Sequence, residues 1–140
     1  RRSFSSQLFV RRVMKNNMNK RVLVFGTFDG LHPGHVFFLR KAKAKGDELV
    51  VAVARDKHVE LLKDKRPDNI ESRRRSGVEG QACVSEALLC DQELGKFDIL
   101  KEVAPDLIVL GHDQKELEDA LITWMTQEDQ YIPMQRIKKL

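Results

Sequence analysis

Residues 22–45 read VLVFGTFDGLHPGHVFFLRKAKAK, and they set the architecture of the chain. The first four are β-branched, aliphatic or aromatic and end at Gly26, which predicts a short buried strand. From Gly34 to Lys45 apolar residues recur at helical spacing between basic ones, and a glycine ends the pattern. A strand, a loop and a helix therefore follow one another within this stretch.

The alternation of strands and helices continues to the end of the chain. Further strands are predicted at Leu49–Ala54, Glu86–Leu89, Leu107–Leu110 and Tyr131–Ile137, and helices at Asp56–Leu62, after the polar stretch Lys63–Arg75, at Phe97–Ala104 and at Gln114–Met125. This pattern predicts an α/β fold with a Rossmann-like open parallel sheet of about five strands and helices on both faces. In such sheets ligands bind beyond the carboxyl ends of the strands, so we expect the loops 26–35, 55–66 and 111–114 to face one site.

The basic charge is concentrated at the start of the chain. The net charge is +4, and residues 1–20 hold six basic side chains and no acid: Arg1, Arg2, Arg11, Arg12, Lys15 and Lys20. The rest of the chain has 19 basic and 21 acidic side chains, which does not favour a nucleic-acid-binding face. No apolar run has the length of a membrane helix. We therefore expect neither nucleic acid nor a membrane as a partner.

We expect a flexible basic leader at residues 1–20 and a single domain at 21–140. The leader is compatible with a mitochondrial transit peptide, with a disordered arm, or with sequence upstream of a start at Met18. A cytoplasmic location is the first expectation and a mitochondrial one the alternative. Cys83 and Cys90 lack zinc or redox spacing and are expected to be reduced, half-buried thiols. His58 and His112 are expected at the surface.

The residues from Gly26 to His35 predict a phosphate site. The first turn of the helix that follows has unpaired N–H groups and a partial positive charge, which attract anions. Pro33 fixes the backbone there, and Gly34 lets a phosphate approach the main chain. His32 and His35 can donate hydrogen bonds to a phosphate whose charge grows in a transition state.

This segment resembles the His-x-Gly-His signature of the cytidylyltransferase-like nucleotidyltransferases. The resemblance implies transfer of AMP or CMP from a nucleoside triphosphate to a small phosphorylated substrate, with release of pyrophosphate. Mg²⁺ would accompany the triphosphate, and a homodimer is expected from relatives. The implied site has catalytic His32, His35, Lys63 and Arg74; nucleotide-binding Gly26, Thr27, Phe28, Gly34, Gly111 and Asp113; and substrate-binding Asp29, Arg55, Lys57 and Lys65.

Three functions stay open at this point. The Gly-x-Asp-Gln loop at 111–114 looks more like the archaeal-type FAD synthase branch, which favours an FMN adenylyltransferase. A CTP-dependent transferase acting on glycerol 3-phosphate or a similar alcohol phosphate is the first alternative. The second is a catalytically weak nucleotide-binding protein, because two glycines at 77 and 80 predict a short, poorly docked helix after Arg74.

Two further expectations concern the ends of predicted elements. The family carries a late Ser/Thr-rich nucleotide contact that does not occur before Leu140, so we expect either a truncated domain or weaker nucleotide binding. Asp113 has two interpretations of equal weight, a nucleotide contact or the N-cap of the helix that follows it.

Overall fold

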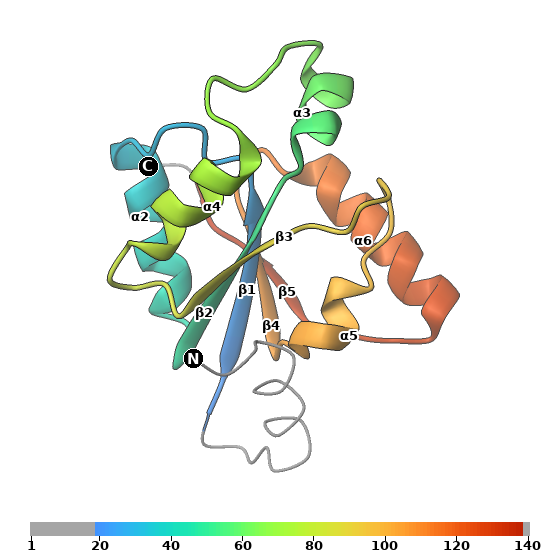
Figure 1. Ribbon diagram of the computed structural model, residues 1–140. Coiled ribbons are helices and arrows are strands. Elements are labelled where there is room, and N and C mark those ends of the chain that lie inside the picture. Colours follow the sequence, from blue (N-terminus) through green and yellow to red (C-terminus); the bar gives the residue numbers. More distant parts are fainter. Residues whose placement is uncertain (1–18, 139–140) are drawn as a thin grey trace.

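The computed structural model describes residues 19–138, which form a five-stranded parallel sheet (Figure 1). The strands are β1 (Arg21–Gly26), β2 (Glu48–Val53), β3 (Glu86–Leu89), β4 (Leu107–Leu110) and β5 (Met134–Arg136). Their order is β3-β2-β1-β4-β5, and every neighbouring pair is parallel. β1 therefore lies at the centre, with β2 and β4 beside it. The predicted α/β fold is confirmed.

Helices cover both faces of the sheet, as predicted. They are α2 (Pro33–Lys43), α3 (Asp56–Lys63), α4 (Glu71–Glu79), α5 (Ile99–Val103) and α6 (Lys115–Glu128). In Figure 1, α2 and α4 lie on one face and α5 and α6 on the other, while α3 lies beyond the carboxyl ends of the strands. None of these helices in residues 19–138 combines the length and the apolar character that crossing a bilayer requires.

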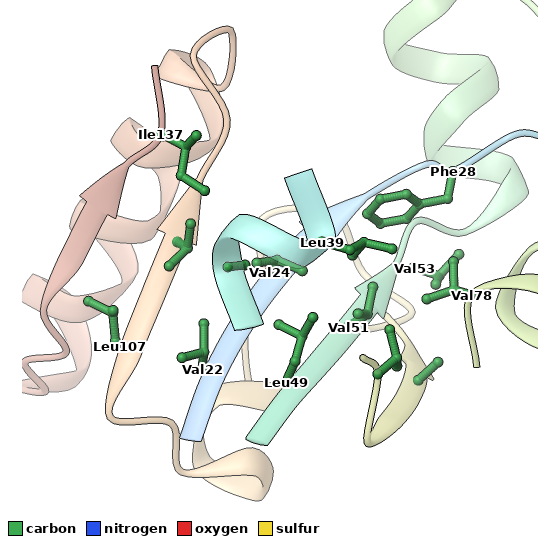
Figure 2. Packing of buried hydrophobic residues seen from close by; sticks show 14 residues of the cluster. Val22, Val24, Phe28, Leu39, Leu49, Val51, Val53, Val78, Leu107 and Ile137 are labelled. Carbon is green, nitrogen blue, oxygen red and sulfur yellow. The ribbon is translucent and has the colours of Figure 1, made fainter. Parts of the chain in front are cut away.

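The alternation of side chains along β1 builds two hydrophobic cores. Val22 and Val24 point to the α2–α4 face, where Figure 2 shows Val24 near Leu39 of α2. Leu23 and Phe25 point to the α5–α6 face. Full burial of a side chain such as Leu23 contributes about 1.5–3 kcal/mol to folding. The central strand is thus apolar on both faces, as parallel strands are.

The structure corrects the expectation for the helix that carries Arg74. α4 runs from Glu71 to Glu79 through Gly77, and Gly80 is its C-cap. Arg74 and Val78 are both buried on the side of α4 that meets the sheet. An interior glycine costs a helix about 1 kcal/mol, and the packing of Val78 against the sheet outweighs that cost. The prediction of a poorly docked helix was therefore wrong.

The predicted leader lies almost entirely outside the described residues, since the description begins at Asn19. The backbone of Lys20 is bonded to the folded part: its N–H donates to the Asp47 carboxylate over 2.6 Å, and its carbonyl accepts from the N–H groups of Asp47 and Glu48. The backbone of Lys20 is therefore held against the sheet.

Replacing Gly77 by Ala is expected to raise the free energy of unfolding by about 0.5–1 kcal/mol. Gly77 is helical, and no atom lies within 4 Å of the position that a Cβ would take. Urea denaturation measures the change.

Gly46→Ala is the matched control with the opposite expectation. Its Cβ would lie 2.7 Å from Cγ2 of Val22 and 2.8 Å from the carbonyl oxygen of Lys20, so this variant should be less stable than the parent. A stability loss of equal size in the two variants would show that α4 does not tolerate a side chain at position 77.

Candidate active site

Two histidines cap the N-terminus of α2. His32 is the N-cap residue, and its Nδ1 accepts a hydrogen bond from the backbone N–H of Gly34 over 3.1 Å. The Nδ1 of His35 accepts from the backbone N–H of His32 over 3.3 Å. The two rings stack with their centroids 3.6 Å apart and their planes 24° from parallel. The structure thus brings together the two histidines that the sequence predicted as a pair.

These capping bonds fix the tautomer of both rings. A ring nitrogen that accepts a hydrogen bond carries no proton, so each neutral imidazole must be protonated on Nε2. Each ring can then donate from Nε2 while Nδ1 stays bonded to the backbone. The helix start therefore prepares two hydrogen-bond donors.

The surroundings favour the neutral form of His35. Burial lowers the pKa of His35 below its ordinary value, and the neighbouring His32 lowers it further, while a hydrogen bond with the backbone of Gly30 opposes them. The first turn of α2 contains no acidic side chain, so the positive end of the helix is left for an anion. Neutral donors and a helix N-terminus together suit a phosphate group.

The loop between β1 and α2 has a strained residue at its centre. Phe28 has φ of 52°, in the left-handed region that costs a bulky residue about 1–3 kcal/mol. Its ring is buried and lies 5.4 Å, edge to face, from the ring of His35. A Cβ on Gly26 would come within 2.6 Å of the Phe28 ring, so this fold of the loop requires glycine there.

Two of the three predicted lysines, Lys63 and Lys65, lie at the end of α3 or just after it. The Nζ of Lys63, the last residue of the helix, is 3.4 Å from the hydroxyl oxygen of Thr27. Asp64 ends α3 in a left-handed conformation, and Lys65 follows it, exposed, in the loop that leads to α4. The structure therefore brings Lys63 to the phosphate loop and leaves Lys65 at the surface near it.

The guanidinium of Arg74 is buried beneath the same loop. Its Nη1 donates to the carbonyl of Thr27 over 2.8 Å, its Nε to the carbonyl of Asn69 over 2.9 Å, and its Nη2 to the carboxylate of Asp56 over 2.6 Å. The side chain is 0% exposed. All three guanidinium nitrogens thus bind protein atoms.

Asp29, which the sequence predicted to bind substrate, is also hydrogen-bonded to other residues of the protein. Its carboxylate accepts hydrogen bonds from the backbone N–H groups of Asp68 and Asn69 and from the side-chain amide of Asn69. Burial alone would raise the pKa of Asp29, but these hydrogen bonds and the nearby Arg74 lower it overall. The carboxylate is thereby kept ionised and tied to the loop before α4.

The loop after β4 joins the same site through Gln114, the last residue of the Gly-x-Asp-Gln pattern, for which the sequence predicted no role of its own. The side-chain oxygen of Gln114 accepts from the N–H of Gly111 over 2.8 Å, and its amide donates to the carbonyl of Phe25 over 3.0 Å. The end of β4 is thereby attached to the end of β1. Gln114, not Asp113, is the N-cap of α6, so the capping interpretation of Asp113 was wrong.

Arg55 and Lys57 lie at the start of α3, near the end of β3. Arg55 donates from Nε to the carbonyl of Cys90 over 2.8 Å and pairs with the carboxylate of Glu71 at 3.5 Å. The Nζ of Lys57 is 3.4 Å from the side-chain oxygen of Gln92. These contacts face the segment after β3, and the assignment of both residues to the substrate stays a prediction.

Buried groups near β3 differ partly from expectation. His58 is buried, with Nε2 3.0 Å from the carbonyl of Gln92, so its predicted surface position was wrong; His112 is exposed as predicted. Cys83 and Cys90 are free and half-buried, as predicted. Burial raises the pKa of the Cys90 thiol to about 12, so this thiol stays protonated at neutral pH.

A groove opens beside the histidine pair. It has a volume of about 630 Å³ and runs from Leu31 and His32 along α2 to Ala44, with Arg40 and Lys41 on its border.

The pKa of His35 predicts how stability depends on pH. Because the folded-state pKa lies below 6.5, the unfolded chain binds a proton at a higher pH than the folded chain. The contribution of His35 to stability is therefore complete above about pH 6.5 and is lost as the pH falls through the folded-state value. Urea denaturation between pH 7.5 and pH 5 should show this loss, and His35→Gln should reduce it. An unchanged pH dependence in the variant would contradict the assignment.

Comparisons with known proteins agree with this geometry. The family model described as Cytidylyltransferase-like matches residues 23–131. A FAD synthase of Methanococcoides burtonii is 53% identical over 95 residues, which are 67% of this chain and 64% of that protein. A FAD synthase of Methanohalophilus mahii is 49% identical over 105 residues, 72% of each chain. The chain thus spans less than two thirds of the first of these relatives.

Two solved structures share the fold. The lipopolysaccharide core biosynthesis protein from Thermoplasma volcanium superposes with a TM-score of 0.77 and 35% identity, over 87% of this chain and 98% of that one. A pantoate-beta-alanine ligase from Francisella tularensis superposes with a TM-score of 0.63 and 11% identity, over 97% of this chain and 65% of that one, which shows the fold alone. With its histidine-capped helix, its parallel sheet and these relatives, the chain belongs to the cytidylyltransferase-like family.

Proposed function

We propose that this chain is an FMN adenylyltransferase, or FAD synthase, which transfers AMP from ATP to FMN. The observation that carries the chemistry is the pair of imidazoles capping α2, whose Nδ1 atoms accept backbone hydrogen bonds and leave Nε2 as the donor atom. The choice of acceptor is supported by the relatives named FAD synthase, which are 45–53% identical to this chain.

In the proposed reaction an oxygen of the FMN phosphate attacks the α-phosphorus of ATP. A new phosphorus–oxygen bond forms as the bond between the α- and β-phosphates breaks, and pyrophosphate leaves. Catalysis of this kind rests on positioning and on stabilising negative charge. His32 and His35 donate hydrogen bonds to the oxygens of the reacting phosphorus, and Lys63 neutralises the departing pyrophosphate.

The loop residues hold the nucleotide in this proposal. The backbone of Thr27 and Phe28 and the Thr27 hydroxyl lie beside Lys63 and the histidine pair. Glycine at position 34 lets the His32 ring lie against the helix start, because a Cβ there would come within 3.0 Å of that ring. Gly111 and Asp113, at the end of β4, face the nucleotide from the neighbouring strand.

We propose that Mg²⁺ enters with the triphosphate. This cation keeps several waters and commonly binds through substrate phosphates. Within residues 19–138 no group of three or more His, Cys, Asp or Glu side chains is arranged to hold a metal ion. When bound, Mg²⁺ would supply charge neutralisation on the phosphates.

A homodimer remains a prediction from the family, and a cytoplasmic location remains a prediction from the sequence. Light scattering after size-exclusion chromatography tests the homodimer.

Pyrophosphate release tests the function and sorts the substrates. The protein is incubated with Mg²⁺ and with each pair formed from ATP or CTP and FMN or glycerol 3-phosphate. We expect pyrophosphate release with the pair of ATP and FMN and with none of the other three pairs. Release only with CTP and glycerol 3-phosphate would show a cytidylyltransferase instead, and release with no pair, together with measurable nucleotide binding, would show a nucleotide-binding protein.

His35→Ala should lower kcat by about 100-fold or more, because it removes a donor aimed at developing charge. His112→Ala is the matched control, since His112 is exposed and has no part in the proposed mechanism. Circular dichroism and thermal unfolding establish that both variants are folded. A folded His35→Ala protein with parental kcat would remove His35 from the mechanism.

A further inference from the structure

The loop after β1 is attached on one side of Phe28 to α4 and on the other side to the segment before α4. Ahead of Phe28, the carbonyl of Thr27 accepts from Nη1 of Arg74 over 2.8 Å. After Phe28, the carboxylate of Asp29 accepts from the backbone N–H groups of Asp68, over 2.7 Å, and Asn69, over 2.9 Å. The strained residue is therefore held between two attachment points.

Asn69 connects these two attachment points. Its side-chain amide donates to Asp29 over 3.0 Å, and its own carbonyl accepts from Nε of Arg74 over 2.9 Å. Hydrogen bonds thus link Thr27, Arg74, Asn69 and Asp29 in series, and the backbone of Phe28 closes this series into a ring. Breaking one of these contacts releases part of the constraint on the loop.

The position of Arg74 argues against direct contact with a phosphate. Its side chain is 0% exposed, and its third nitrogen donates to Asp56 at the start of α3 over 2.6 Å. The Asp56 N–H in turn donates to Glu71, and the Glu71 N–H donates to Asp56, so α3 and α4 fix each other. The guanidinium would have to leave all three acceptors to reach solvent.

The ring of hydrogen bonds acts on the catalytic histidines through Phe28. A left-handed phenylalanine persists only where its surroundings impose that conformation. Its side chain is 4% exposed, and its ring packs against Gly26 on one side and the His35 ring on the other. A shift of the loop would therefore move or expose the His35 ring.

We propose that Arg74 and Asn69 are positioning residues, which hold the strained loop and thereby the His35 ring in the geometry that nucleotidyl transfer requires. Arg74 takes this role in place of the phosphate contact expected from the sequence. The proposal rests on the proposed function for its kinetic part, whereas its structural part concerns the loop alone.

A double-mutant cycle with Arg74→Lys and Asn69→Ala tests the proposal. Each single variant should lower kcat about 10- to 100-fold, because small displacements of reacting groups are costly, while KM for ATP changes less than about threefold. The double variant should be little worse than either single one, since both changes open the same ring. Effects that multiply, or a large rise in KM with kcat retained, would show that Arg74 acts separately on the nucleotide.

Substituting the partners of the ring gives a second kinetic test. Asn69→Asp places a carboxylate against Asp29 and should lower kcat at least as much as Asn69→Ala. Asp29→Asn should lower kcat as well, because its amide nitrogen would face the backbone N–H of Asp68 or of Asn69. Parental kcat in folded Asn69→Asp and Asp29→Asn proteins would contradict the ring. Arg73→Lys, at an exposed position of α4, is the matched control for Arg74→Lys and should behave as the parent.

Two readouts do not depend on turnover. The first readout is amide hydrogen exchange in folded Arg74→Lys and Asn69→Ala proteins, which should accelerate at residues 26–31 and stay unchanged in β4 and α6. The second is the pKa of His35 measured by NMR in the same variants, which should rise toward 6.5 because the ring loses burial. Unchanged exchange in the loop would overturn the positioning role. If the parent protein releases no pyrophosphate, the proposed function is wrong. The positioning role of the ring of hydrogen bonds would still be tested by these two readouts.

Discussion

The unpaired N–H groups at the start of α2 are the constraint on which the site depends. A helix start needs acceptors, and here two imidazole nitrogens supply them in place of the usual hydroxyl or carboxylate. Because Nδ1 of each ring is occupied in this way, the opposite nitrogen must carry the proton. One local requirement of helix geometry therefore sets the orientation and the tautomer of two groups suited to phosphate.

The rest of the fold supports that helix start. The central position of β1 brings the loops after β2 and β4 to either side of it, and Gln114 fastens the β4 loop to the end of β1. Beneath the loop lies Arg74, a cation with carbonyl and carboxylate partners in a dry environment. A buried guanidinium suits this task because its planar fork can donate to several fixed acceptors at once.

Sequence patterns predicted the layers and the histidine pair because both leave periodic or contiguous signals. The five strands, the helices on both faces and the phosphate loop between Gly26 and His35 follow from such signals. Long-range partners left none: nothing in the polar stretch 63–75 shows that Asn69 meets Asp29 or that the guanidinium of Arg74 is buried. His58 was misplaced for the same reason, since a tertiary contact with Gln92 hides it. The glycines of α4 led to a wrong prediction because helix propensity describes only the local chain. The packing of Val78 against the sheet stabilises that helix, and propensity does not include it.

The mutual bonds between Asp56 and Glu71 have a consequence for how this part of the molecule unfolds. Each carboxylate accepts the first N–H of the other helix, so neither helix start is complete while the other is melted. α3 and α4 should accordingly open as one cooperative unit, although seven residues of irregular chain separate them in sequence. The segment that carries Lys63 and the buried arginine would then be lost or regained in a single step.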